Sequence, residues 1–118
     1  MTDAERQLAR DPQDLERFLI ARQHAGDIDG MVDLFEPDAI VDTGEGEPIR
    51  GLAAIRAHFE GLETEGRRFT MGVQQPALIS GDLALTSTRS PNGSVTAEVA
   101  RRQPDGTWRW AIDQYAIA

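Results

Sequence analysis

One aspartate stands at the end of an apolar run. Ala39-Ile40-Val41 leads into Asp42, and the glycine-rich acidic loop 43–47 follows at once. A carboxylate in this place is a catalytic base at a pocket mouth, a metal ligand, or a solvated strand end bonded to the next backbone amides. An apolar wall would raise its pKa and strengthen it as a base. The loop lacks the ligand spacing of a helix–loop–helix calcium site, so we expect no metal centre.

A second acidic pair depends on strand register. Pro104-Asp105-Gly106 is typical of a hairpin turn between strands at 94–102 and 108–117. A two-residue turn would place Glu98 opposite Asp113, and two carboxyl groups facing a pocket would tend to hold one proton between them. A type I turn with a bulge would shift the register by one residue and separate them onto opposite faces. The sequence leaves both registers open.

Aromatic residues follow the same last strand. Tyr115 lies on the face of Asp113 and could donate a hydrogen bond to a ligand oxygen. Trp108 and Trp110 share a face that Ile112 should continue. They could wall a ligand pocket, but large aromatic residues also dominate cores and dimer interfaces.

Composition excludes several classes of function. The chain has 118 residues, 40% of them hydrophobic, which fits one domain spanning 1–118 with a polar lead at 1–10. A net charge of -8 argues against nucleic-acid and acidic-membrane partners. Without cysteine there is no thiolate chemistry, and His24 and His58 lie too far apart to grip a metal together. No secretory or membrane-spanning segment is visible, so we expect a cytoplasmic protein.

The elements that must position these residues change in type along the chain. Asp11-Pro12 is typical of a helix start, Gly26 of a helix end, and Asp27 of the cap of a second helix that stops near Glu36. A third helix spans 52–62 by its apolar spacing. The expected strands are 39–42, 67–73, 83–89, 94–102 and 108–117. Helices first and strands last indicate an α+β fold with helices on one face of the sheet.

Three stretches carry a resemblance to a known family. They are AGDIDGMVDLFEPDAIVD (25–42), EPIRGLAAIRAHFEGL (47–62) and RRQPDGTWRWAID (101–113). With the order of elements, they resemble the nuclear transport factor 2-like superfamily, which includes ketosteroid isomerases and SnoaL-like polyketide cyclases. The resemblance implies a cystatin-like cone: three N-terminal helices on a curved, mostly antiparallel sheet, enclosing an apolar pocket. It also implies a homodimer formed through the outer face of the sheet.

The resemblance also suggests roles for individual residues. In isomerase-like members an aspartate at this strand end is the general base, which makes Asp42 or its neighbour Thr43 the match. The tyrosine that stabilises the enolate there falls at Leu19 here, and the protonated aspartate falls near Ala100. At both positions this sequence departs from the isomerase pattern, because neither side chain can donate a hydrogen bond. Without these donors, steroid isomerisation is not the expected reaction.

The sequence therefore predicts a protein that binds a small apolar molecule, with a cofactor-free acid–base enzyme of isomerase, cyclase or dehydratase type as one possibility. In that enzyme Asp42 is the base, and Asp113 and Tyr115 are the acid or donor. The residues expected to contact the ligand are Leu19, Phe59, Glu98, Ala100 and Trp110. The alternative is a non-catalytic ligand-binding or dimerisation module of the same fold, and an assembly domain for larger partners is a third possibility.

Overall fold

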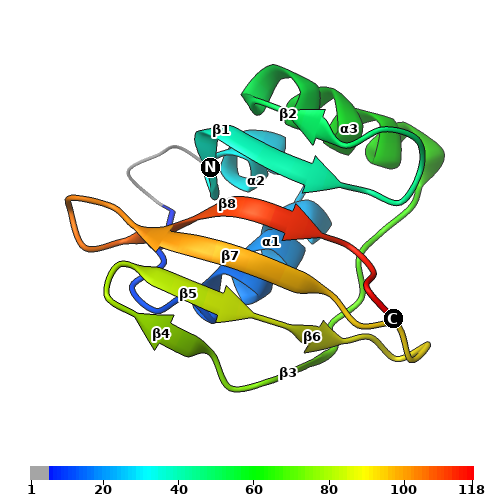
Figure 1. The fold of residues 1–118 in the computed structure, drawn as a ribbon. Helices are drawn as coiled ribbons and strands as arrows, with labels where there is room; N and C mark the ends of the chain where they lie inside the picture. Colours follow the sequence, from blue (N-terminus) through cyan, green and yellow to red (C-terminus); the bar gives the residue numbers. More distant parts are fainter. Residues whose placement is uncertain (1–5) are drawn as a thin grey trace.

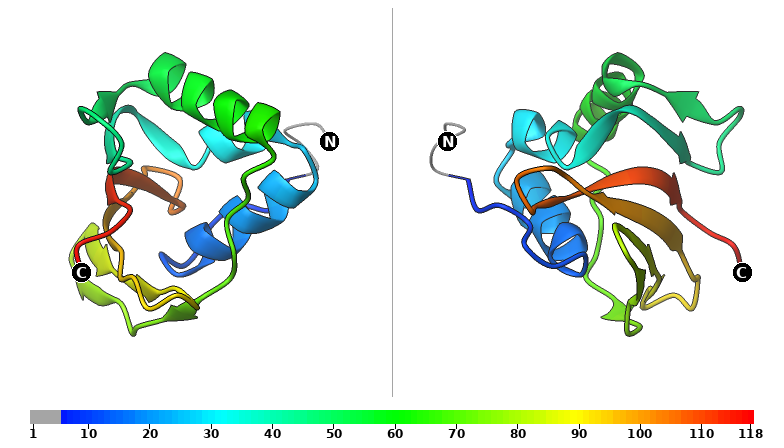
Figure 2. Two further views of the ribbon diagram at one scale, coloured as in Figure 1. Left: turned by 90° about the vertical axis from the view of Figure 1, so that its right-hand side faces the viewer. Right: turned by 60° about the vertical axis from the view of Figure 1, so that its left-hand side comes forward.

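The computed structural model describes residues 6–118, in which helices cover one face of a curved sheet (Figures 1 and 2). The helices are α1 (Asp14–His24), α2 (Ile28–Val32) and α3 (Leu52–Glu65). The strands are β1 (Phe35–Asp42), β2 (Ile49–Arg50), β3 (Val73–Gln74), β4 (Leu78–Ser80), β5 (Leu83–Thr86), β6 (Thr88–Arg89), β7 (Ala97–Arg102) and β8 (Trp108–Gln114). Among the described residues, no helix is both long and apolar enough to cross a bilayer.

The main sheet has six strands in the order β2-β1-β8-β7-β5-β4. Only the β1–β8 pair is parallel; the other neighbours run antiparallel. A separate two-stranded ladder joins β3 to β6. The predicted α+β class, with three helices on a mostly antiparallel curved sheet, is confirmed.

The junction between α1 and α2 forms as the sequence predicts. Gly26 adopts a positive φ of 71°, and the Asp27 amide donates to the Arg22 carbonyl at 2.8 Å, which closes a Schellman motif. The Asp27 side chain then accepts from the Gly30 amide at 3.1 Å and caps α2. The two helices are thereby held at a fixed angle.

Other elements differ from the sequence-based prediction. The second helix ends at Val32, and β1 begins at Phe35, because Pro37 fits an extended segment but not a helix. The alternating stretch 67–73 is mostly loop and joins a ladder only at Val73. The Phe69 ring packs against Phe59 of α3, and the Phe69 amide donates to the Gln23 side chain of α1 at 2.7 Å, where a strand would bond a neighbouring strand. The short strand β4 was not predicted at all.

The β7–β8 hairpin resolves the register question by combining both alternatives. Next to the turn, Arg102 pairs with Trp108 and Ala100 with Trp110. Between Trp110 and Ile112 the strand holds one extra residue, Ala111, so the pairing shifts by one. Beyond this bulge Glu98 pairs with Asp113, as in the two-residue register.

The bulge at Ala111 also changes which side chains face inward. Trp108 and Trp110 are buried, whereas Ile112 is 48% exposed on the outer face. The expectation that Ile112 continues the tryptophan face is therefore wrong, because the extra residue reverses the alternation. Asp113 takes the inward place and is only 5% exposed.

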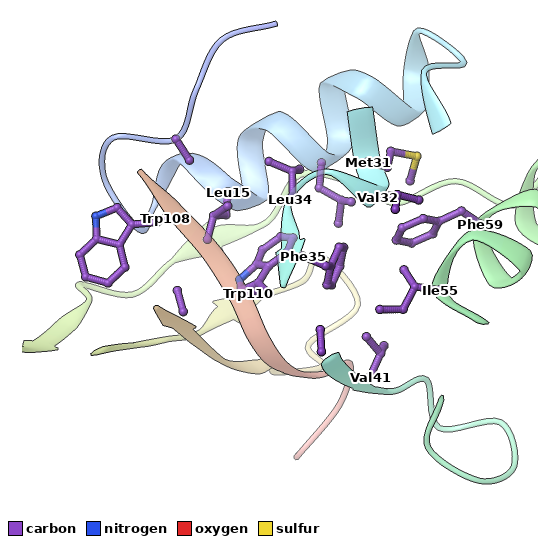
Figure 3. Packing of buried hydrophobic residues seen from close by; sticks show 14 of the residues in the cluster. Leu15, Met31, Val32, Leu34, Phe35, Val41, Ile55, Phe59, Trp108 and Trp110 are labelled. Atoms are coloured by element: carbon purple, nitrogen blue, oxygen red, sulfur yellow. The ribbon is translucent and has the colours of Figure 1, made fainter. Parts of the chain in front are cut away.

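The core lies between the helices and the inner face of the sheet (Figure 3). Phe35 is its centre: its ring centroid is 5.1 Å from that of Trp110 and 5.8 Å from that of Phe59. Leu15 and Ile55 bring α1 and α3 onto this cluster and are fully buried. Such aromatic side chains each bury a large apolar area and fix the spacing of helix and sheet.

The segment before α1 is packed and not merely a polar lead. Arg6 forms a two-fold ion pair with Asp27, with both N–O distances at 2.8 Å, and its hydrogen bond holds the pKa of Asp27 down at about 2. The carbonyl of Ala9 accepts from the Trp108 amide at 2.8 Å, which fastens the segment to the sheet. The first part of the predicted lead, residues 1–5, lies outside the described residues.

Gly30 is expected to be essential to this junction. A Cβ there would lie 2.2 Å from Asp27 Oδ2 and 2.7 Å from Arg6 Nε. Gly30→Ala should therefore break the ion pair and cost about 2 kcal/mol of unfolding free energy, measured by urea denaturation. Gly61→Ala is the matched control: it lies in α3 with open space around it. That change should stabilise the protein by about 0.5–1 kcal/mol, and equal effects at both sites would contradict the assignment.

Candidate functional site

A cavity of about 340 Å³ opens between α1, the ends of β7 and β8, and two surface loops. Its volume falls within the range of small-molecule pockets. The residues lining it are Glu16, Leu19, Arg68, Phe69, Thr70, Ser90, Pro91, Asn92, Thr96, Glu98, Asp113 and Tyr115.

The inner end of the cavity is acidic. Glu98 and Asp113 are each 5% exposed and lie opposite one another in the β7–β8 ladder. Directly opposed side chains have Cβ atoms about 5 Å apart. Glu16 reaches the same cavity from α1. Within residues 6–118, no hydrogen bond or ion pair engages the carboxyl group of Glu16 or Asp113.

Glu98 is the acid that the protein itself supports as an anion. Its Oε1 accepts from the Thr86 hydroxyl at 2.7 Å. Burial raises the pKa of Glu98, and hydrogen bonds from Thr96 and Thr86 hold that rise back. A carboxylate stabilised in this way can ionise before its neighbours do.

The other two acids retain their protons longer. Burial, followed by the charge of Glu98, raises the pKa of Glu16 to about 7. Burial also raises the pKa of Asp113 well above its usual value, and the charges of Glu98 and Glu16 add to the effect. Near neutral pH the cavity thus holds Glu16 close to half-ionised, together with an Asp113 carboxyl group whose protonated form burial favours, which is the arrangement of an acid–base pair.

Tyr115 brings a phenol to the same space. Burial, with the charges of Asp113 and Glu16, raises its pKa well above 10, so the hydroxyl stays protonated. The hydroxyl lies 3.1 Å from His58 Nε2, and the two ring centroids are 5.7 Å apart. Burial lowers the pKa of His58, so the imidazole is neutral near neutral pH and can hold the phenol in place.

Apolar side chains and a polar rim complete the cavity. Leu19 and Phe69 form apolar wall, and the Phe69 ring packs edge-on against Tyr115 at 5.7 Å. Arg68, Thr70 and Asn92 are exposed and form the outer rim. No group of three or more histidines and acids within residues 6–118 could hold a metal ion.

Asp42 does not line this cavity. Its Oδ1 accepts from the Gly44 amide at 3.0 Å, in an exposed turn just after β1. This is the local bonding of a solvated strand end, one of the alternatives that the sequence left open. The Asp42 carbonyl accepts from the Tyr115 amide at 3.0 Å, so the two backbones are adjacent, but the Asp42 side chain does not line the cavity that Asp113 and Tyr115 line.

The other predicted residues divide between cavity and core. Leu19 and Glu98 line the cavity together with Asp113 and Tyr115. Phe59, Ala100 and Trp110 belong instead to the hydrophobic core and are each at most 2% exposed. They support the wall from behind and do not form its surface.

Glu16 is the acid of the site that the sequence analysis missed. It precedes the buried residues Leu19, Ile20 and Gln23 by three, four and seven positions. These are the helical spacings of one face, so a carboxylate here points toward the core side of α1. An acid on the apolar stripe of a helix is the signal that would have found it.

Comparison with known proteins agrees with this architecture. Residues 15–117 match the model of the SnoaL-like domain. This chain belongs to the SnoaL-like domain family. It is a member of the nuclear transport factor 2-like superfamily, as the sequence resemblance predicted. No curated protein matches the chain.

Solved structures share the SnoaL-like fold at low sequence identity. A candidate calcium/calmodulin-dependent protein kinase type II association domain from Thiobacillus denitrificans aligns with a TM-score of 0.70 and 19% identity, over 92% of this chain and 96% of that one. A candidate ketosteroid isomerase from Parabacteroides distasonis aligns with a TM-score of 0.65 and 20% identity, over 86% of this chain and 81% of that one. A candidate dehydratase from Streptomyces avermitilis aligns with a TM-score of 0.65 and 14% identity, over 86% of this chain and 90% of that one. These likenesses show the fold alone.

The raised pKa of Glu16 predicts a stability that falls with pH. Between the ordinary value of 4.5 and about 7, the folded protein binds more protons at Glu16 than the unfolded chain does. The free energy of unfolding should therefore decrease as pH rises through this window. Glu16→Gln should raise it at pH 8 by about 1–3 kcal/mol relative to wild type, with little gain at pH 4.

Urea denaturation at several pH values measures this effect. Glu63→Gln, which changes an exposed acid on α3, is the control and should leave the pH dependence as it is. A Glu16→Gln protein whose stability parallels wild type at every pH would show that Glu16 titrates normally.

Proposed function

We propose that this SnoaL-like protein is a cofactor-free acid–base enzyme that moves a proton on a small, partly apolar carbonyl compound. The observation that carries the proposal is the content of one cavity of about 340 Å³: the Glu16 carboxyl group with a pKa raised to about 7, the buried Asp113 carboxyl group with a raised pKa, and the Tyr115 phenol. A general base is most effective when its pKa lies near the pH at which the enzyme works.

Each group has a distinct task in this proposal. The Glu16 carboxylate removes a proton from the carbon next to the substrate carbonyl. The Tyr115 hydroxyl, held by His58, and the protonated Asp113 donate hydrogen bonds to the oxygen on which negative charge develops. Return of the proton to another carbon gives isomerisation, and loss of a hydroxyl group as water gives dehydration. Attack of the enolate carbon on a second carbonyl of the same molecule, whose oxygen then takes the proton, gives ring closure. Leu19 and Phe69 supply the apolar wall.

Hydrogen–deuterium exchange tests this proposal without knowledge of the natural substrate. Cyclohexanone, indanone and tetralone are incubated with the protein in deuterated water, and label at the carbon next to the carbonyl is followed by NMR. Wild type should accelerate exchange of at least one ketone, with a rate that rises through pH 7 as Glu16 ionises. Glu16→Gln should lower the exchange rate at least a hundredfold, which is within the range that general bases contribute to a rate.

Two further variants sharpen the assignment. Tyr115→Phe should lower the exchange rate by about tenfold to a hundredfold, because one donor to the developing charge is lost. Asp42→Asn should retain full activity, since Asp42 is bonded in the turn outside the cavity. No exchange with any ketone would favour a non-catalytic ligand-binding module. Loss of activity in Asp42→Asn alone would restore Asp42 as the base.

We further propose a homodimer formed through the outer face of the sheet. Leu78, Leu85, Val99, Ile112 and Ile40 occupy successive places in register across β4, β5, β7, β8 and β1. We call this set the apolar row; its exposed members include Leu78 at 70% and Leu85 at 48%. The helices lie on the opposite face, so no helix of residues 6–118 shields the apolar row (Figure 1). A contiguous exposed apolar surface of this kind is typical of an interface.

Ile112→Glu should disrupt the dimer by placing a charge inside the apolar row, between Val99 and Ile40. Size-exclusion chromatography with light scattering should show a dimer for wild type and a monomer for this variant. Val73→Glu is the matched control, because Val73 is equally apolar and 68% exposed but lies on the separate β3–β6 ladder. A wild-type monomer, or dissociation caused equally by both variants, would contradict the proposed interface.

A further inference from the structure

The carboxyl groups that line the cavity lie away from solvent and have no paired cation among residues 6–118. Ion pairs join arginines to acids nearer the surface, as in Arg56–Asp29 and Arg101–Glu36. Within residues 6–118, none of the ion pairs involves Glu16, Glu98 or Asp113. These are the acids with the strongest reason to be paired, since a buried charge is costly without a partner.

Glu98 and Asp113 define where a missing cation would lie. They face one another across β7 and β8 at the inner end of the cavity, with Cβ atoms about 5 Å apart by their register. Asp113 is 95% buried, since its exposure is 5%, and it lines the cavity without a hydrogen-bond partner among the described residues. The Glu98 carboxyl group accepts from the hydroxyls of Thr86 and Thr96, which are neutral donors and leave its charge without a cation.

No ion pair within the part of the chain that the structure describes supplies a positive charge to these acids. Arg68 is the arginine that lines the cavity, but it is exposed on the rim and forms no ion pair with the three acids. The net charge of -8 adds a general attraction for cations. A group that enters the inner end therefore meets acceptors and negative charge.

We propose that the inner end of the cavity binds its ligand through a protonated amine placed between Glu98 and Asp113. An ammonium group has three N–H donors and no acceptor, which complements two facing carboxyl groups. Its hydrogen bonds to carboxylates are charge-assisted and about twice as strong as neutral ones. This inference rests on the proposed function for the identity of the site and narrows its substrate to a carbonyl compound that carries a basic nitrogen.

The proposed amine is compatible with the acid–base roles. When the ammonium group binds, Asp113 gives its proton to solvent and becomes an acceptor for an N–H. Tyr115 then remains as the donor to the developing oxyanion, still held by His58 at 3.1 Å. Glu16, on the facing helix α1, remains free as the base.

Three probes of one ring size test the inference by calorimetry at pH 8. Cyclohexylamine is a cation, cyclohexanol is neutral, and cyclohexanecarboxylate is an anion. The amine should bind at least tenfold more tightly than the alcohol, and the carboxylate should bind most weakly. The inference is overturned if the alcohol or the carboxylate binds as tightly as the amine.

Variants show whether the preference arises at this pair. Glu98→Gln keeps an oxygen that can accept from Thr86, and it should reduce amine affinity by at least tenfold while leaving alcohol affinity unchanged. Asp113→Asn should do the same. Asp42→Asn removes one exposed charge outside the cavity and should change neither affinity. An equal loss in Asp42→Asn and Glu98→Gln would mean that overall charge, and not this pair, attracts the amine.

The exchange assay on neutral ketones keeps the two proposals separate. Ketone exchange without an amine preference would overturn the amine site and leave the enzyme proposal standing. An amine preference without ketone exchange would support the amine site in a protein that binds but does not catalyse.

Discussion

The bulge at Ala111 is the constraint on which both faces of the sheet depend. One extra residue in β8 turns Asp113 and Tyr115 toward the helices and sends Ile112 outward. Without it, the alternation set by Trp108 and Trp110 would bury Ile112 and expose the carboxyl group. The chemistry of the cavity and the apolar row on the outside are therefore consequences of one irregularity in one strand.

The core and the cavity are connected by a series of aromatic contacts. From Trp110 the rings lead through Phe35, Phe59 and Phe69 to Tyr115, with neighbouring centroids between 5.1 and 6.4 Å apart. The phenol is thus held by packing on one side and by its imidazole partner on the other. Catalytic groups need such support, because their geometry is only as exact as the shell behind them.

Sequence reasoning recovered the parts of the fold that local chemistry determines. The Gly26-Asp27 junction followed from the need for a positive φ and a side-chain cap, and it was predicted correctly. The stretch around Met71 alternates like a strand but forms a loop, because its pairing depends on neighbours that the local pattern does not specify. For the same reason the register of the last hairpin could be narrowed only to two alternatives.

Prediction of the site was limited by the same long-range effects. Asp113 and Tyr115 were identified as candidates on one strand face, but the side of the sheet that this face occupies depended on a bulge with no marked sequence signal. Glu16 was overlooked because an acid in the first turn of a helix is usually explained by the helix dipole alone. Asp42 attracted attention by its place after an apolar run, and the structure shows it bonded to its own turn.

The reactive groups of the cavity and its rim lie on parts of the chain that differ in rigidity. Its carboxyl groups sit on a helix and on paired strands, whereas its rim comes from the loop around Arg68 and the turn around Asn92. Loops accept substitutions and changes of length more readily than the elements that they connect. Relatives could therefore diverge in the molecules they admit while keeping the same reactive groups, and exchanging these two short segments is a direct way to redesign selectivity.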